Sequence, residues 1–286
     1  MQLGAVLSQS DLGPEVSVIR DFAQATQDLG YDFMVAPDHV VGAEPGAHPE
    51  LPRVFSIETS MREPLTIFAF LAAAAPRLGF LSSVVILPQR QATLVAKQAA
   101  DVDQFCGGRL RLGVGIGWNP IEFEALGMRF DNRARRFEEQ IEVMRKLWTE
   151  RVVTFEGRYH TLVSAGLNPR PVQQPIPIWI GAAAEASVRR ATRIAEGYLP
   201  LRPLEGGWQA TLEKVWGWLE DAGRSRESFG IEGRLEAGSG SPDDWRKTVE
   251  LWRGFSASHL SVGVSGIHGV NAQIQRLREV RQVLEP

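Results

Sequence analysis

The sequence is poor in cysteine and contains no long hydrophobic run. A single cysteine, Cys106, among 286 residues excludes an internal disulfide and is typical of a reducing compartment. No apolar run reaches the roughly 20 residues that a membrane-spanning helix needs. The first residues, MQLGAVLSQSDLG, lack the basic start and apolar core of a secretion signal. These absences predict a cytoplasmic protein with no membrane partner.

The sequence also lacks an excess of positive charge. Its 31 Lys and Arg residues stand against 34 Asp and Glu residues, for a net charge of -3. Nothing here could neutralise a phosphate backbone, so nucleic acid is not expected as a partner, whereas a small ligand is allowed. The five histidines have no metal-ligand spacing, and no GxSxG or CxxC motif occurs. We therefore expect no metal site.

Short β-rich runs, each followed by a helical pattern, are what the sequence does contain. Strands are predicted at 2–7, 32–36, 79–87, 110–116, 176–181, 197–201, 229–236 and 259–264. Between them, apolar residues recur three and four apart, as in the stripe Phe137, Ile141, Met144 and Trp148 that follows Asn132. Eight alternating units with nearly continuous apolar strands favour an α/β fold, a closed (β/α)₈ TIM barrel, over an open sheet.

Two polar segments rich in proline and glycine exceed the minimal repeat. Residues 39–63 follow the second strand and residues 151–175 follow the fourth helix, and the latter segment is predicted to contain a hairpin from Val152 to Leu162. No linker or shift in composition marks a second domain, so we expect residues 1–286 to form one domain.

Asp38 and His39 directly follow the second predicted strand, in the run VAPDHVV. In a TIM barrel the active site lies at the carboxyl ends of the strands, so this pair is placed where chemistry occurs. A capping aspartate beside a surface histidine is the structural alternative. We favour a catalytic pair, in which His39 exchanges a proton near neutral pH and Asp38 fixes its tautomer or contacts the ligand.

A glycine-rich run, GVGIGW, ends the fourth predicted strand. Its spacing is not that of a dinucleotide fingerprint, and glycines at a strand end more often let a flat ligand approach the backbone. Gly117 and Trp118 then line a pocket, although Trp118 could equally be a packed loop residue.

After the fifth strand, the run from Gly181 through Ala182, Ala183 and Ala184 opens a helix. It could bind an anion through free backbone N–H groups or be a plain tight turn.

Several of these runs together resemble the bacterial luciferase-like superfamily. They are GGRLRLGVGIGWNPIEFEALG, the helix RFEEQIEVMRKLW, the short FEGRYH, PIPIWIGAAAEASVRRA, and EGY. The resemblance stretches from about residue 32 to 200, and the order of elements agrees to the end of the chain. The form GWNPIEFE, with Asp-His after the second strand, is most similar to the branch that uses the deazaflavin coenzyme F420.

The resemblance implies a TIM barrel that binds a flavin-type ring at the strand ends. Asp38 and His39 would face the ring, Ser83 and Val84 would form a non-prolyl cis peptide that supports it, and Gly117 and Trp118 would line the pocket. The segment 181–184 would hold the cofactor phosphate. A homodimer is implied as well. Some deazaflavin-dependent sugar-phosphate dehydrogenases carry a glutamate where this chain has Trp118, so a more hydrophobic substrate is expected.

The expected function is therefore an oxidoreductase that transfers a hydride between coenzyme F420 and an organic small molecule, with His39 supplying or removing the proton and Asp38 orienting it. The first alternative is an FMN-dependent monooxygenase of the same family that works with a partner flavin reductase. The second is a barrel that binds a flavin without catalysis.

Overall fold

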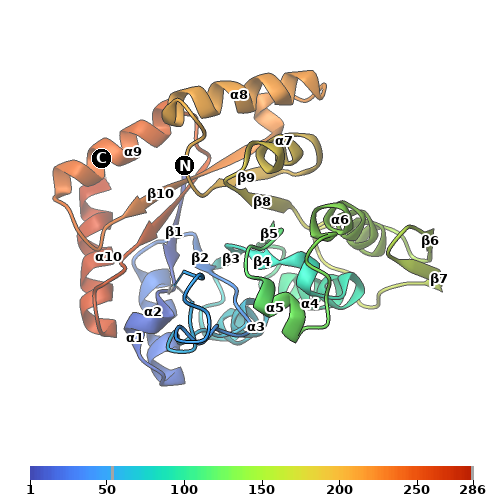
Figure 1. Ribbon diagram of the computed structural model, residues 1–286. Helices are drawn as coiled ribbons and strands as arrows, with labels where there is room; N and C mark the ends of the chain where they lie inside the picture. Colours follow the sequence, from blue (N-terminus) through green and yellow to red (C-terminus); the bar gives the residue numbers. More distant parts are fainter. Residues whose placement is uncertain (53–54, 285–286) are drawn as a thin grey trace.

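The protein folds around a closed barrel of parallel strands (Figure 1). The computed structural model describes residues 1–52 and 55–284. Residues 53–54 of the predicted first insertion and residues 285–286 of the predicted domain lie outside that part. Within it, the strand order β3-β2-β1-β11-β10-β9-β8-β5-β4 closes on itself because β3 also pairs with β5. Since β3 and β4 share one position, the barrel has eight parallel strands in the described chain, and the predicted TIM barrel is confirmed.

The barrel strands lie close to their predicted bounds. They are β1 (Gln2–Val6), β2 (Phe33–Ala36), β3 (Gly79–Ser82), β4 (Val85–Ile86), β5 (Leu110–Gly115), β8 (Ile178–Ala182), β9 (Gly197–Pro200), β10 (Gly230–Glu236) and β11 (His259–Gly263). The third predicted strand, 79–87, is the exception, because it is interrupted between β3 and β4.

That interruption is a β-bulge. Phe80 pairs with Leu110 of β5, whereas Val85 pairs with Val114, so the third strand carries one residue more than its neighbour over this interval. The peptide bond between Ser83 and Val84, inside the bulge, is cis, as the resemblance implied. The bulge sets the two halves of the third strand out of line at the carboxyl end of the barrel.

Helices surround the barrel (Figure 1). The longer ones are α2 (Val16–Asp28), α3 (Pro64–Ala74), α4 (Ala92–Phe105), α6 (Arg133–Thr149), α7 (Glu185–Ile194), α8 (Gly207–Asp221), α9 (Pro242–Gly254) and α10 (Val270–Leu284); α1 (Gln9–Leu12), α5 (Pro120–Ala125) and the 3₁₀ turns η1 (Leu87–Gln89) and η2 (Arg226–Ser228) are short. The predicted stripe of α6 is buried at all four positions, which confirms the period. No helix in residues 1–52 and 55–284 combines the length and apolar character of a membrane span.

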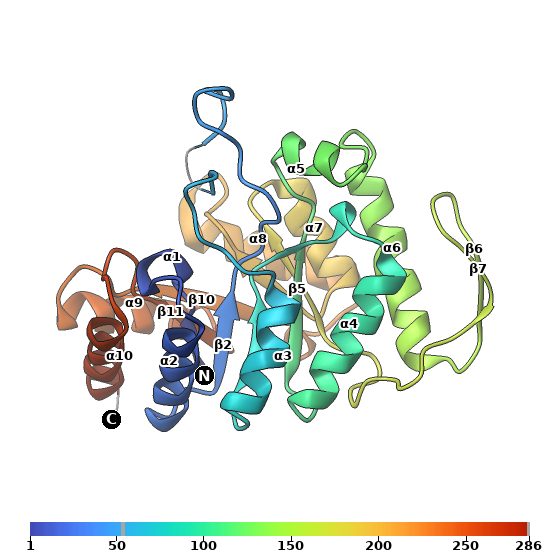
Figure 2. The ribbon, with the colours of Figure 1, turned by 90° about the horizontal axis from the view of Figure 1, so that it is seen from below.

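The two segments that exceed the minimal repeat leave the barrel in different directions. The described parts of the first segment, residues 39–52 and 55–63, lie between β2 and α3 above the strand ends (Figure 2). After α6, the strands β6 (Val153–Glu156) and β7 (Thr161–Ala165) form the predicted antiparallel hairpin, which reaches further than expected and stands out from the side of the barrel (Figure 2). Glu139 of α6 anchors its turn by accepting hydrogen bonds from the backbone N–H groups of residues 158–160. The described part of the first segment therefore lies over the strand ends, and the hairpin of the second segment does not (Figure 2).

The barrel interior is apolar in one part and ionic in another. Phe33, Val35, Leu81, Trp179 and Leu199 form a separate apolar cluster. Within the interior, Arg111 of β5 pairs with Glu232 of β10 at 2.8 Å. The guanidinium of Arg111 also lies 4.2 Å from the ring centroid of Phe33 and 4.8 Å from that of Trp179. Arg111 is thus neutralised and packed from both sides.

Candidate active site

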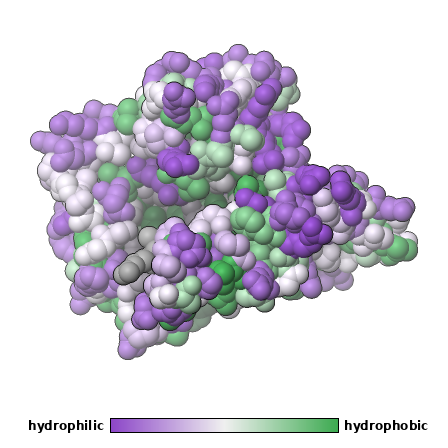
Figure 3. Space-filling model, viewed as in Figure 1, coloured by the Kyte–Doolittle hydropathy of each residue, from purple (hydrophilic) through white to green (hydrophobic). Residues whose placement is uncertain are grey.

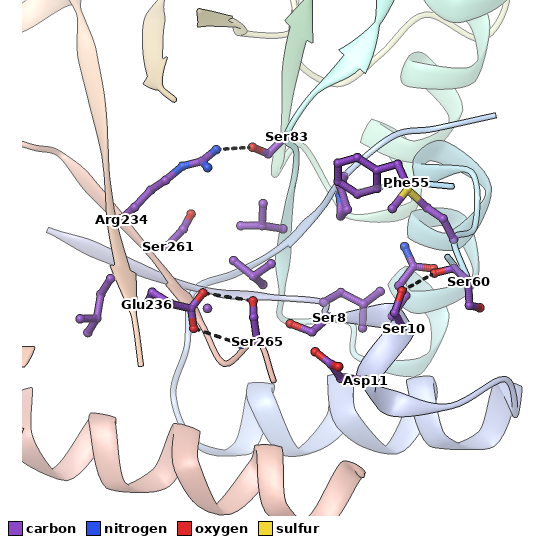
Figure 4. A pocket seen from close by; sticks show the side chains of 18 residues that line it. Ser8, Ser10, Asp11, Phe55, Ser60, Ser83, Arg234, Glu236, Ser261 and Ser265 are labelled. Carbon is purple, nitrogen blue, oxygen red and sulfur yellow. Dashed lines mark hydrogen bonds between the residues drawn. The ribbon is translucent and has the colours of Figure 1, made fainter. Parts of the chain in front are cut away.

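A cavity of about 510 Å³ lies at the carboxyl ends of β1, β2, β10 and β11. This is the end of the barrel where TIM-barrel enzymes place their active sites. The face is hollowed near its centre (Figure 3), and a close view shows side chains converging there from the loop after β1, the loop before α3 and the inner face of β10 (Figure 4). The volume is in the range of small-molecule sites, about 300–1,000 Å³.

The cavity has an apolar part and a polar part. Its apolar lining consists of Val6, Leu7, Val35, Pro37, Phe55, Met61 and Leu235. Its polar lining is rich in hydroxyl groups and includes Ser8, Gln9, Ser10, Asp11, Ser60, Ser83, Arg234, Glu236, Ser261 and Ser265. The sequence led us to expect a substrate more hydrophobic than a sugar phosphate, and the apolar part of such a molecule would leave this polar wall unused.

His39 lies in a smaller cavity of about 50 Å³ that shares Phe55 and Met61 with the larger one. Its ring stacks on Phe55 with centroids 4.1 Å apart and meets Trp118 edge-on at 5.9 Å. Its Nδ1 atom lies 2.9 Å from Oε2 of Glu122. The imidazole is therefore held on one nitrogen by a carboxylate and enclosed by two aromatic rings.

Glu122 is the group that orients His39, and it is almost fully buried. It also accepts hydrogen bonds from the backbone N–H of Val40 at 2.8 Å and from Nε2 of Gln89 at 3.3 Å. Burial raises the pKa of Glu122, but the hydrogen bonds from His39, Val40 and Gln89 outweigh it and hold that pKa below its ordinary value. The carboxylate is thus charged at neutral pH and can accept a hydrogen bond from the Nδ1–H group of His39.

The prediction that Asp38 orients His39 is wrong. Asp38 is 2% exposed and uses one oxygen to accept the N–H of Ile86 at 2.9 Å and the other to bind Arg90 at 2.6 Å. Arg90 also forms an ion pair with Glu63, the residue before the first residue of α3, at 3.1 Å. Burial raises the pKa of Asp38, and the Arg90 guanidinium and the Ile86 amide offset that rise only in part. Asp38 instead braces the segment that follows the bulge.

The glycines of GVGIGW make room for the residues of the bulge rather than for a ligand. A Cβ at Gly113 would lie 1.8 Å from the carbonyl oxygen of Ser82, and one at Gly115 would lie 2.7 Å from a methyl group of Val84. Gly181 meets Val84 from the other side, where a Cβ would lie 2.6 Å from it. The expectation that strand-end glycines admit a flat ligand is therefore corrected, because these positions are filled by the neighbouring strand.

The remaining predicted residues lie at the ends of β5 and β8 and in the segments that follow these strands. Gly117 has φ +75° and packs against Ile86, and Trp118 is 41% exposed beside His39. Gly181 and Ala182 belong to β8, while Ala183 and Ala184 lead into α7. Ala184 caps this helix without a side-chain hydrogen bond. Among the predicted residues, all of which the structure describes, Ser83 alone lines the larger cavity and His39 alone lines the smaller one.

Two residues of this region were missed from the sequence. Glu122 lies in the acidic turn after Trp118, where Asn119 caps α5 by accepting the N–H of Ile121 at 3.0 Å. Arg234 lies on β10 between Glu232 and Glu236. Charges at every second position of a buried strand were the available signal, because alternate side chains of a barrel strand point inward.

Comparison with known proteins places the chain among relatives of two kinds. It is 35% identical over 182 residues to Rv0940c of Mycobacterium tuberculosis, and the match spans 62% of each chain, less than two thirds of that relative. It is 35% identical over 143 residues to an FMNH(2)-dependent dimethylsulfone monooxygenase of Pseudomonas putida (49% of this chain, 39% of the other). It is 29% identical over 241 residues to an F420-dependent glucose-6-phosphate dehydrogenase of Microbacterium testaceum (79% and 65%).

Among solved structures, an F420-dependent secondary alcohol dehydrogenase in complex with an F420-acetone adduct superposes with a TM-score of 0.81. The superposition covers 100% of this chain and 99% of that one at 17% identity, so it establishes the fold. The family description luciferase-like monooxygenase matches residues 2–285, nearly the whole chain. The barrel, the bulge and this match agree, and the chain belongs to the luciferase-like monooxygenase family.

Proposed function

We propose that the protein is an oxidoreductase that transfers a hydride between coenzyme F420 and an organic substrate bound in the cavity at the carboxyl ends of the strands. The observation that carries the proposal is the His39–Glu122 pair beside that cavity. An oriented imidazole at this position suits a reaction in which a proton moves together with a hydride. The similarity to an F420-dependent dehydrogenase over 79% of the chain supports the choice of cofactor.

The residues present fit a ring with an anionic tail. The larger cavity has the volume of a small-molecule site, and Ser83 of the bulge forms part of its wall. The first backbone N–H groups of α7, a helix of 10 residues, lie behind Ala184, which has no polar side chain to occupy them. A helix N-terminus of this kind favours a phosphate. Ala183 and Ala184 would thus hold the phosphate, and Ser83 and Val84 would lie beside the ring.

In the proposed mechanism the bound deazaflavin supplies two-electron hydride chemistry. Nδ1 of His39 donates to the Glu122 carboxylate, which leaves Nε2 as the atom that takes or gives the proton. Phe55 and Trp118 enclose the imidazole and limit its contact with water. Asp38, through Ile86 and Arg90, holds the segment behind the bulge in place.

Titration of the purified protein with F420 and with FMN, followed by cofactor fluorescence, tests the proposal. We expect F420 to bind more tightly than FMN. Tight binding of FMN alone would overturn the choice and favour a monooxygenase that works with a flavin reductase. FMNH(2)-dependent monooxygenation is the activity named for the Pseudomonas putida relative. Cofactor binding without turnover of any alcohol, aldehyde or enone would favour a non-catalytic barrel.

A further inference from the structure

Two arginines lie on the barrel strands β5 and β10, and of these two only Arg111 makes an ion pair, whereas Arg234 is exposed and lines the cavity. Arg111 has Glu232 as its partner. Arg234, two residues further along β10, makes its one hydrogen bond to the hydroxyl of Ser83, at 3.0 Å. Within residues 1–52 and 55–284 no carboxylate lies within ion-pair distance of Arg234. The close view shows its guanidinium extended toward Ser83 across the cavity (Figure 4).

The acidic groups nearest to Arg234 along the chain are already engaged. One carboxylate oxygen of Glu232 accepts a hydrogen bond from Arg111, and the other accepts one from the hydroxyl of Ser261. Glu236 accepts from the backbone N–H and the hydroxyl of Ser265 at 3.0 and 3.1 Å. Arg234 therefore makes no ion pair among the described residues and lines the cavity with an exposed side chain, although desolvation lowers the pKa of its guanidinium more than the charge of Glu232 raises it.

A second free donor lies on the same cavity. Gln9 is 4% exposed, and its Oε1 accepts the backbone N–H of Arg62 at 2.8 Å. Because Oε1 takes this bond, the other amide atom is Nε2, which has no hydrogen-bond partner among the described residues. Asp11, the other carboxylate on the wall, is tied to the backbone N–H of Gly266 at 3.0 Å. The cavity thus offers the unpaired charge of Arg234 and the unpartnered Nε2 of Gln9, while both carboxylates on its wall already accept hydrogen bonds.

We infer that the cavity binds a substrate carrying a carboxylate, with Arg234 as its counter-ion and Ser83 beside it. A carboxylate only accepts hydrogen bonds, and it matches the planar guanidinium in geometry and charge. A phosphate dianion fits less well, because one cation would face it while Asp11 and Glu236 lie on the same wall. The apolar lining around Val35, Phe55 and Met61 would receive the rest of the molecule. That the bound carboxylate belongs to a substrate rests on the proposed function; the anion site itself does not.

The site is tested with benzoate and benzamide, which have the same shape and differ in charge, by calorimetric titration of the protein without cofactor. We expect benzoate to bind at least about tenfold more tightly than benzamide, as a charge-assisted contact provides. Arg234→Met should remove this preference and Arg234→Lys should keep part of it. Arg253→Met, on the exposed face of α9, is the matched control and should behave as the unaltered protein. A thermal melt of each variant verifies that it is folded.

Equal binding of benzoate and benzamide by the unaltered protein would overturn the inference, as would an unchanged preference in folded Arg234→Met. A second experiment tests whether the anion bound at Arg234 belongs to the substrate or to the cofactor. Benzoate binding that persists after saturation with F420 or FMN assigns the site to the substrate, whereas displacement by either cofactor assigns Arg234 to the cofactor and overturns the inference. Failure of both cofactors to bind would refute the proposed function and leave the benzoate result to decide the anion site.

Discussion

His39 is the residue on which the proposed chemistry depends most directly. Its Nδ1 atom is taken by Glu122, its ring is packed between Phe55 and Trp118, and only its other nitrogen remains for a substrate. His39→Ala removes the proton donor and leaves the bulge and the α7 terminus intact. We expect turnover to fall about a hundredfold or more, with cofactor affinity little changed. Steady-state kinetics and cofactor titration on the same preparations measure both, and unchanged turnover would remove His39 from the mechanism.

Glu122 should make the stability of the protein depend on pH in a defined direction. Because its folded-state pKa is held below the ordinary value, its stabilising contribution is fully present above that ordinary value and is lost as the pH falls through the folded pKa. At about pH 7 we expect Glu122→Gln to lower the free energy of unfolding by about 1–3 kcal/mol. The difference between variant and unaltered protein should shrink as the pH falls below that ordinary value and through the folded-state pKa.

Urea unfolding of the two proteins at several pH values measures this difference. Glu124→Gln is the matched control, since Glu124 lies in the same short helix α5 but is exposed and its side chain has no hydrogen-bond partner among the described residues. A gap between Glu122→Gln and the unaltered protein that stays constant with pH would contradict the assigned pKa. A similar gap for Glu124→Gln would show that the effect is not specific to the His39 partner.

Among the elements, the bulge of the third strand depends on the glycines that face it. A methyl group added at Gly181 would lie 2.6 Å from Val84, inside contact distance. We expect Gly181→Ala to destabilise the protein by about 1–3 kcal/mol, as overpacking does, and to weaken cofactor binding. Combined with Val84→Ala, which removes the opposing methyl groups, the same substitution should cost much less. Thermal and urea unfolding of the four proteins of this cycle measure the coupling.

A glycine without such a neighbour provides the comparison. Gly217, within α8, has no atom near its added Cβ, so Gly217→Ala should be neutral or stabilise the protein by up to about 1 kcal/mol. If Gly181→Ala were as harmless as Gly217→Ala, Val84 would not be confined as described.

The N-terminus of α7 is the element predicted to hold the cofactor phosphate. Ala184→Asp places a negative charge on the free N–H groups of this helix while providing a good N-cap. We expect the variant to be folded and at least as stable, and to bind the cofactor about tenfold more weakly. Ala184→Ser supplies a neutral cap and should keep most of the affinity. Fluorescence titration with both cofactors compares them, and equal affinity of Ala184→Asp would place the phosphate elsewhere.

At the scale of the whole molecule, the homodimer that the resemblance implied stays a proposal. The neighbouring helices α3 and α4 expose apolar side chains outward, namely Phe70 (40%), Leu94 (52%) and Phe105 (61%). We expect the protein to sediment as a dimer and Leu94→Arg to shift it toward monomer, since a stable interface buries about 1,200–2,000 Å². Val163→Arg on the outlying hairpin is the control and should not change the sedimentation. A monomeric unaltered protein at micromolar concentration would refute the proposal.

The sequence by itself determined the alternation of strands and helices, the bounds of most barrel strands within a few residues, and the closed barrel. These follow from periods of two and 3.6, which are written locally along the chain and need no knowledge of distant partners. Asp38 and His39 were placed correctly at the end of β2 for the same reason. The resemblance added the cis peptide at Ser83, which no local pattern encodes.

Only the tertiary structure decided which groups meet. Glu122 reaches His39 across 83 residues of sequence, and Arg234 reaches Ser83 across 151. Adjacent residues of an extended segment point in opposite directions, so Asp38 turned inward to Ile86 and Arg90 while its neighbour His39 faced the rim. Closing a barrel brings the ends of all its strands to one rim, and the partner of each side chain there is set by strand register and by the bulge, which the sequence pattern does not contain.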